Sequence, residues 1–249
     1  MLGFALVHGG HGGAWNWDAV VPLLAAPAVA VDLPGRGGVQ AGDAPVTFRS
    51  CAQAVLDASV AAGFEQVVAV GHSMGGFTIS ALADLAPTRV AHLVYLAALA
   101  PRPGATVFDI YYTSHGAEPP RFAEPIVPIR SADEVRDRLY ADLDDELLAR
   151  IHPRMVAEPL SLFHDGFVDP PASIPRTYVR CARDVPVPVP MATSFIENLG
   201  PSTLVVDLDL GHGLIFTNPA RTAAVLNDAL PARRARRPVR RGTATRAPS

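Results

Sequence analysis

The chain has 249 residues, of which 49% are hydrophobic and 18% charged, and its formal net charge is −3. This length and composition are typical of one globular α/β domain and exclude a disordered protein. No apolar run approaches the roughly 20 residues that cross a membrane, and the N-terminus lacks the basic segment of a signal peptide. The sequence has two cysteines, Cys51 and Cys181, which is too few for a disulfide framework or a metal site. Because it shows neither such a framework nor a signal peptide, we expect a cytoplasmic protein.

Short apolar runs alternate with helical patterns, which predicts a mainly parallel sheet of about six strands flanked by helices. Strands of such a sheet are buried on both faces, which explains why they are continuously apolar. The expected strands cover residues 4–7, 29–31, 66–70, 93–96, 177–181 and 203–206.

Helices are expected between these strands. The first follows Trp17, with Val20, Val21, Leu23 and Leu24 as its apolar face. The next has Thr47 as its N-cap and ends before Gly63. Further helices are expected over residues 77–85, 191–199 and 219–230.

This alternation breaks between about residue 102 and residue 175. The segment has Pro-rich turns and two expected helices, near 131–139 and 144–157. We interpret residues 102–175 as a helical cap, inserted after the fourth strand at the carboxyl edge of the sheet. Residues 1–101 and 176–230 then form the core.

The last segment, residues 231–249, holds seven of the 21 basic residues and no acidic one. It has no apolar periodicity, and we interpret it as a flexible Arg-rich tail. The rest of the chain carries 14 basic against 24 acidic residues, or about −10. A nucleic-acid-binding arm is the alternative, but so acidic a body disfavours it. We expect neither a nucleic-acid nor a membrane partner.

Ser73 stands between an apolar strand and a helical pattern, in Gly71-His72-Ser73-Met74-Gly75-Gly76. A serine at the tip of a strand–turn–helix is the G-x-S-x-G arrangement of a nucleophile. So sharp a turn strains the serine backbone, and glycines two residues on either side leave room for it. The alternative is a phosphate-binding loop, but the fingerprints G-x-G-x-x-G and G-x-x-x-x-G-K-[ST] are both absent.

A serine nucleophile needs a base, and the base needs a third group to orient it. Among the eight histidines, His212 alone stands on a glycine-flanked loop after the last expected strand. His72 adjoins Ser73, but the turn directs its side chain elsewhere. The other candidates precede the cap or lie within it: His92, His115, His152 and His164.

The acid is expected on the loop after the strand at 177–181, which indicates Asp184. Asp169, near the end of the cap, and Asp207 or Asp209, beside the last strand, are rivals. Asp32 precedes the serine and is interpreted as a turn residue.

An acyl-transfer site also needs donors for the developing oxyanion. The N–H of Met74, directly after the serine, is the first candidate. The N–H of Gly10, on the glycine-rich loop after the first strand, is the second. A plain glycine turn is the alternative for that loop.

Together these motifs resemble the α/β-hydrolase fold, and within it the branch of plant methyl-ester esterases, hydroxynitrile lyases and related bacterial esterases. The resemblance covers about residues 3–228. It implies Ser73, Asp184 and His212 as catalytic triad, with Gly10 and Met74 as oxyanion donors. The segments that carry it are His8–Trp17 with Pro22-Leu23-Leu24, Gly71–Gly76, Tyr95–Ala98, Ser161–Phe163, Cys181–Asp184 and Gly211-His212.

Two departures bear on the reaction. Hydroxynitrile lyases of this branch carry a threonine after the first-strand histidine and a lysine after the catalytic histidine. Here these positions are Gly9 and Gly213. Without a cation at 213 nothing obvious stabilises a leaving cyanide, and Gly9 leaves room for an acyl-enzyme and water. The balance favours an esterase.

The sequence therefore predicts a cofactor-free serine hydrolase that acts on a small or medium carboxylic ester and needs no metal. A lyase or cyclase that uses His212 as base is the first alternative, and a ligand-binding protein with little turnover is the second. The oligomeric state is open, with a homodimer as one candidate. Beside Gly9, cap aromatics are expected to line the pocket or to form the cap's own core: Phe108, Tyr111, Tyr112, Phe122 and Phe163.

Overall fold

The computed structural model describes residues 1–36, 38–40, 42 and 44–231. The Arg-rich tail expected at 231–249 lies, apart from Pro231, outside the described residues. No helix in the described part of the chain is both long and apolar enough to span a membrane.

A six-stranded sheet forms the centre of the molecule, in the order β2-β1-β3-β4-β7-β8, and every neighbouring pair is parallel. The predicted six strands and their parallel arrangement are confirmed. The order reverses between β1 and β3, so the loops after these two strands flank a switch point, where α/β proteins bind ligands. The strands are β1 Leu2–Val7, β2 Ala28–Val31, β3 Gln66–His72, β4 Val90–Leu96, β7 Arg176–Cys181 and β8 Leu204–Leu208.

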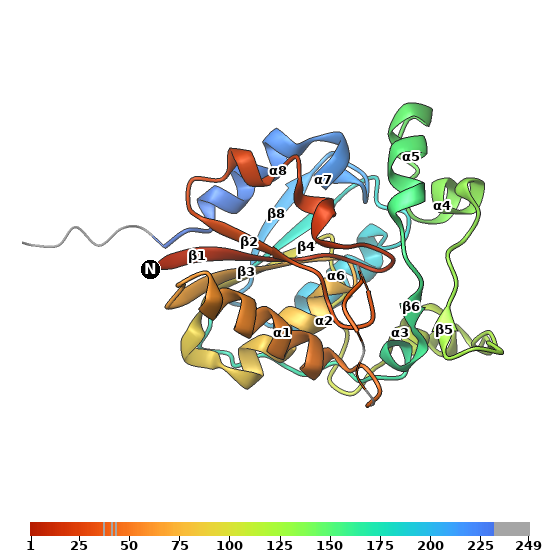
Figure 1. Ribbon diagram of the computed structural model, residues 1–249, viewed down its shortest axis with the longest axis horizontal. Helices are drawn as coiled ribbons and strands as arrows, with labels where there is room; N and C mark the ends of the chain where they lie inside the picture. The colour runs from red at the N-terminus through yellow and green to blue at the C-terminus, as the bar shows by residue number, and fades with distance from the viewer. Residues whose placement is uncertain (37, 41, 43, 232–249) are drawn as a thin grey trace, which may run out of the picture.

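Helices cover both faces of this sheet (Figure 1). Side chains alternate along each strand, so Ala5 and Val7 belong to one buried cluster, and Phe4 and Leu6 to the other. The first cluster includes α1 Phe48–Ala61, α2 Gly75–Leu85 and α6 Val189–Leu199. The second includes α7 Leu214–Thr217 and α8 Pro219–Asp228.

The prediction of a helix after Trp17 was wrong. Two short 3₁₀ turns stand there, η1 Ala14–Trp17 and η2 Val21–Leu23. Pro22 has no N–H to donate to the carbonyl of Asp18, so an α-helix cannot run on from Trp17 through Leu24. Trp17 and Val20 are buried, whereas Leu23 is 46% exposed.

The other core helices agree with prediction to within a few residues. Thr47 caps α1 as expected: its Oγ1 accepts a hydrogen bond from Ser50 N at 3.0 Å, and Ser50 Oγ accepts one from Thr47 N at 3.0 Å. A further 3₁₀ turn, η3 Pro87–Arg89, joins α2 to β4.

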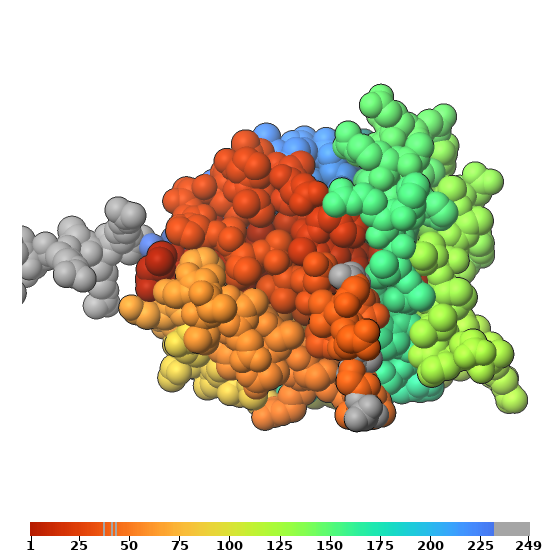
Figure 2. Space-filling model, viewed as in Figure 1, coloured from red at the N-terminus to blue at the C-terminus, as the bar shows by residue number. Residues whose placement is uncertain are grey.

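Between β4 and β7 the chain forms small elements at the carboxyl ends of the strands (Figure 1), and in space-filling view they cover the right-hand side (Figure 2). The two predicted helices are present, but α5 is shorter than expected because Pro153 stands in the 3₁₀ turn that ends it. The antiparallel pair β5–β6 was not predicted. The elements are α3 Val107–Tyr111, η4 Thr113–His115, β5 Ile126–Val127, α4 Ala132–Arg138, α5 Asp145–Ile151, η5 His152–Arg154, β6 Glu158–Pro159 and η6 Leu160–Phe163.

Loss of the α1 cap gives a first test. Thr47→Ala removes the acceptor for Ser50 N and should lower the free energy of unfolding by about 1 kcal/mol. Denaturant unfolding measures the change. Gln53→Ala, on the exposed face of the same helix, is the control and should stay within about 0.5 kcal/mol of wild type. Equal stability of Thr47→Ala and wild type would contradict the cap.

Candidate active site

Ser73 occupies the sharp turn between β3 and α2, with a φ of 53° in the left-handed region. Its glycine neighbours sit where no side chain fits. A Cβ on Gly71 would lie 2.5 Å from Gly75 O, and one on Gly75 would lie 2.9 Å from His8 O. A Cβ on Gly76 would collide with Leu99 O. The turn therefore requires these glycines for a steric reason, and it holds Ser73 at the carboxyl edge of the sheet.

His212 and Asp184 form a buried pair. His212 Nδ1 lies 2.8 Å from Asp184 Oδ2, and the two side chains are 3% and 1% exposed. Asp184 is itself held, because its Oδ1 accepts a hydrogen bond from Val187 N at 2.8 Å. With Nδ1 facing the carboxylate, Nε2 is the ring nitrogen on the opposite side, where a base can take a proton.

The rival acids lie elsewhere. Asp207 forms an ion pair with Arg180, and Asp209 with Arg183. Asp32 accepts a hydrogen bond from Ala14 N, as expected of a turn residue. Asp169 is exposed. Of the candidate acids, Asp184 is therefore the one that His212 contacts.

Two buried histidines support the site from beneath. His72 Nε2 lies 2.9 Å from His212 O, which ties β3 to the loop of the candidate base. Burial, and secondarily the neighbouring His212, hold the pKa of His72 well below its usual value. Burial and the positive charge of Arg36 lower the pKa of His8 to about 3. Both rings are therefore neutral at pH 7.

The two residues that carry the candidate oxyanion donors are neighbours in space. A Cβ on Gly10 would make an ordinary contact with Met74 Cε, at 3.9 Å. Among the described residues, no protein group accepts a hydrogen bond from the N–H of Gly10 or of Met74. Free backbone donors next to a serine are what an oxyanion hole requires.

A cavity of about 480 Å³ brings these groups together, since Ser73, His212, Gly10 and Met74 all line it. Three of the expected aromatics line it too: Tyr111, Tyr112 and Phe163.

Gly9, Phe108 and Phe122 are not among the described residues that line this cavity, so a substrate contact of these three stays a prediction. Phe108 is buried and packs on Phe163 at a ring distance of 5.4 Å, so it belongs to the insertion's own core. Gly9 lies beneath the site, where an added Cβ would be 2.7 Å from Ser73 Cβ.

The sequence also left part of the wall unidentified, because a local pattern can predict a helix or a loop but not which of its residues meet at one cavity. The buried Tyr140 places its ring 5.9 Å from that of His212. The other lining residues that were missed are His11, Leu99, Val107, Val127, Arg130, Asp137, Arg138, Leu139, Val185, Pro186, Pro188 and Met191.

The insertion also contacts the loop that carries the base. Asp142 Oδ1 accepts a hydrogen bond from Gly213 N at 3.1 Å. A Cβ on Gly213 would collide with Leu143, so no side chain fits at this position without displacing the insertion. In the described part of the chain, no cluster of three or more His, Cys, Asp or Glu could hold a metal ion.

The model of the alpha/beta hydrolase family matches residues 4–225. The chain belongs to this family. Ser73 and its flanking glycines stand between β3 and α2, which is the strand–turn–helix context that the G-x-S-x-G motif requires.

The relatives of this α/β-hydrolase are named for different reactions, some for ester cleavage and some for a synthase. Methylesterase 7 of Arabidopsis thaliana is 29% identical over 248 residues, covering 90% of this chain and 94% of the relative. Norfluorocurarine synthase 1 of Strychnos nux-vomica is 24% identical, with coverage of 90% and 94%. The solved structure of the methylesterase MES16 from Arabidopsis is 25% identical, with a TM-score of 0.74 and coverage of 92% and 98%.

The buried histidines make stability sensitive to acid. Because their pKa values in the folded state lie below the ordinary histidine value of about 6.5, the unfolded chain binds more protons below that pH. The free energy of unfolding should therefore fall as pH drops, by about 1 kcal/mol per pH unit for each histidine. His8→Asn, whose amide can still donate to Gly9 O, should reduce this slope between pH 6 and pH 4. Replacement of the exposed His115 by Gln is the control, and an unchanged slope in His8→Asn would contradict the assignment.

Proposed function

We propose that this α/β-hydrolase is a serine esterase that cleaves a small or medium carboxylic ester through an acyl-enzyme on Ser73. The observation that carries the proposal is the convergence, on one cavity, of Ser73, the Asp184-bound His212 and two free backbone donors. This is the set of roles that acyl transfer requires: nucleophile, oriented base and oxyanion hole.

In the proposed reaction His212 Nε2 takes the proton of Ser73 Oγ as the oxygen attacks the ester carbonyl. The N–H groups of Gly10 and Met74 stabilise the negative charge on the carbonyl oxygen. His212 then protonates the leaving alcohol, and a water molecule, activated by the same base, hydrolyses the acyl-enzyme. Asp184 holds the tautomer of His212 and stabilises its protonated form. This scheme uses no metal or cofactor.

The cavity supports a substrate of modest size. Its volume of about 480 Å³ is within the range of small-molecule sites, and its wall is largely apolar and aromatic. Tyr111, Tyr112 and Phe163 lie on that wall and are proposed to contact the substrate. The name of Methylesterase 7 supports a methyl ester as a first substrate to test.

Three further statements stay predictions. Residues 102–175 act as the cap that shapes the substrate pocket over the core of 1–101 and 176–230. The enzyme is cytoplasmic and acts on a small-molecule ester without a nucleic-acid or membrane partner. A homodimer is the candidate assembly, which size-exclusion chromatography with light scattering would test.

A lyase, cyclase or synthase reaction, with His212 as base and Ser73 orienting the substrate, is the second candidate. One relative supports it, because its printed name is that of a synthase. Two positions favour ester cleavage instead: Gly9 packs directly against Ser73, and Gly213 packs against the insertion, so neither presents a side chain to the substrate.

A ligand-binding protein with little turnover is the third candidate function. Labelling by a fluorophosphonate distinguishes a reactive serine from such a silent site.

Ser73→Ala tests the nucleophile. Loss of the hydroxyl should reduce kcat for p-nitrophenyl or methyl esters by about 10⁴-fold or more and abolish fluorophosphonate labelling. Mass spectrometry of wild type during turnover should detect the acyl-enzyme. The exposed Ser114, replaced by alanine, is the control and should keep wild-type turnover. An unchanged rate in a folded Ser73→Ala protein would refute the esterase mechanism.

Asp184→Asn tests the acid. The amide cannot hold His212 in the required tautomer, so kcat should fall by about 10³- to 10⁴-fold while KM changes little. Asp207→Asn is the matched control, since Asp207 lies next to β7 but bonds Arg180 and not the histidine. Full activity of Asp184→Asn would show that another carboxylate orients His212.

A further inference from the structure

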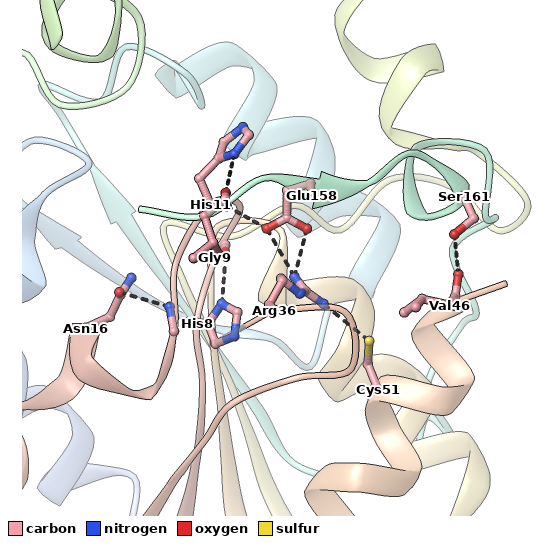
Figure 3. A network of polar contacts seen from close by, with 11 residues as sticks. His8, Gly9, His11, Asn16, Arg36, Val46, Cys51, Glu158 and Ser161 are labelled. Carbon is pink, nitrogen blue, oxygen red and sulfur yellow. Dashed lines mark hydrogen bonds and ion pairs between the residues drawn. The ribbon is translucent and has the colours of Figure 1, made fainter. Parts of the chain in front are cut away.

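A buried ion pair joins the core to the insertion close to the active site (Figure 3). Arg36, in the turn after β2, places Nη1 3.0 Å from Oε2 of Glu158 on β6, and the side chains are 1% and 0% exposed. Removing two charges from water is unfavourable, and an ion pair alone rarely offsets it. A contribution to the free energy of folding therefore does not explain why these two charges are buried at this place.

Glu158 has a second contact, at the candidate oxyanion loop. Its Oε1 accepts a hydrogen bond of 2.6 Å from the backbone N–H of His11. His11 directly follows Gly10, whose N–H is the proposed oxyanion donor, and His11 itself lines the cavity. The carboxylate thus holds the peptide next to the donor.

The backbone of His11 needs such a hold. Its φ is 60°, a left-handed conformation that costs free energy for a residue other than glycine and persists where neighbouring groups stabilise it. Two further hydrogen bonds join it to the insertion: Val156 N donates to His11 O at 3.1 Å, and His11 Nδ1 lies 2.9 Å from Val156 O. The insertion therefore clamps His11 through both its backbone groups and its ring.

Arg36 in turn orients Glu158. Its Nη1 lies within reach of both carboxylate oxygens, and its Nη2 donates to Cys51 Sγ on α1 at 3.3 Å. Other contacts between core and insertion, such as Ser161 Oγ donating to Val46 O at 2.7 Å, join the two without any buried charge. Attachment of the insertion alone does not explain the pair.

We propose that Glu158 and Arg36 are positioning residues for the oxyanion hole. Glu158 fixes the His11 N–H and thereby directs the Gly10 N–H at the substrate oxygen, and Arg36 fixes Glu158. This inference rests on the proposed function. It extends that function by assigning part of the transition-state stabilisation to a residue of the insertion that does not touch the substrate.

Two double variants isolate the role, because both remove the buried charges and differ only at one acceptor. Arg36→Met with Glu158→Gln keeps an oxygen for the His11 N–H, whereas Arg36→Met with Glu158→Met does not. Apolar replacement of a buried pair is often neutral for stability, so the Met form should fold. The Gln form should fold as well, because its amide carries no charge and its oxygen keeps the hydrogen bond from His11 N. The Gln form should keep kcat within about threefold of wild type, and the Met form should lose about 10- to 100-fold in kcat with little change in KM.

A second readout separates positioning from general damage. A trifluoromethyl ketone forms a tetrahedral oxyanion on the serine, whereas the matching methyl ketone stays largely a ground-state ligand. Inhibition by the trifluoromethyl ketone should weaken in the Met form in parallel with kcat, while binding of the methyl ketone should not change. Ser161→Ala, which removes an uncharged hydrogen bond between insertion and core, should leave all these values unchanged.

Equal kcat in the two double variants, or equal weakening of both ketones, would overturn the proposal. Should the Met form not fold, Glu158→Asp replaces it: the shorter side chain keeps its charge near Arg36 but withdraws from His11, and it should lower kcat without raising KM. Wild-type kcat in that variant would equally refute the role.

Hydrogen exchange makes the result independent of turnover. The amide of His11 should exchange as in wild type in the Gln form and faster in the Met form. Absence of ester cleavage by wild type would overturn the proposed function, and exchange would still decide whether Glu158 holds the loop. Ester cleavage with equal exchange in both forms would refute the positioning role alone.

Discussion

Close packing of backbone around Ser73 is the constraint on which the rest of the site depends. Because residues 71, 75 and 76 have no Cβ, α2 begins against His8 O on one side and Leu99 O on the other. Leu99 N donates to Ser73 O at 2.9 Å, which ties the turn to the segment after β4. The same crowding that strains the serine thus packs its turn against the segments that follow β1 and β4.

The sheet alone does not complete the site. The loops that carry Gly10 and His212 extend beyond the strands, and residues of the insertion hold both of them. Asp142 bonds the backbone of the His212 loop, and Glu158 bonds that of the Gly10 loop. A segment that would be read as a lid over the substrate therefore also sets the geometry of the groups beneath it.

Much of this architecture could be predicted because it follows from local rules. A strand buried on both faces must be continuously apolar, and each predicted run became a strand of the sheet. The glycines near Ser73 and the cap at Thr47 act over three or four residues, so the sharp turn and the start of the helix can both be predicted from the sequence. Prediction failed where local signals conflict, since the apolar residues around Pro22 form only a 3₁₀ turn. Where local signals are absent, the sequence left two possibilities open: Phe108 packs within the insertion, whereas its neighbour Tyr111 lines the cavity.

The sequence by itself determined the class of fold, the turn at Ser73, and the candidates for base, acid and oxyanion donors. Tertiary structure alone showed that His212 bonds Asp184 and none of the rival carboxylates, decided which of the expected aromatics line the cavity, and placed the Arg36–Glu158 pair beside the Gly10 loop. The physical reason is distance along the chain. Glu158 meets His11 across 147 residues and Arg36 across 122, and no pattern of neighbouring residues records a contact that only the completed sheet brings about.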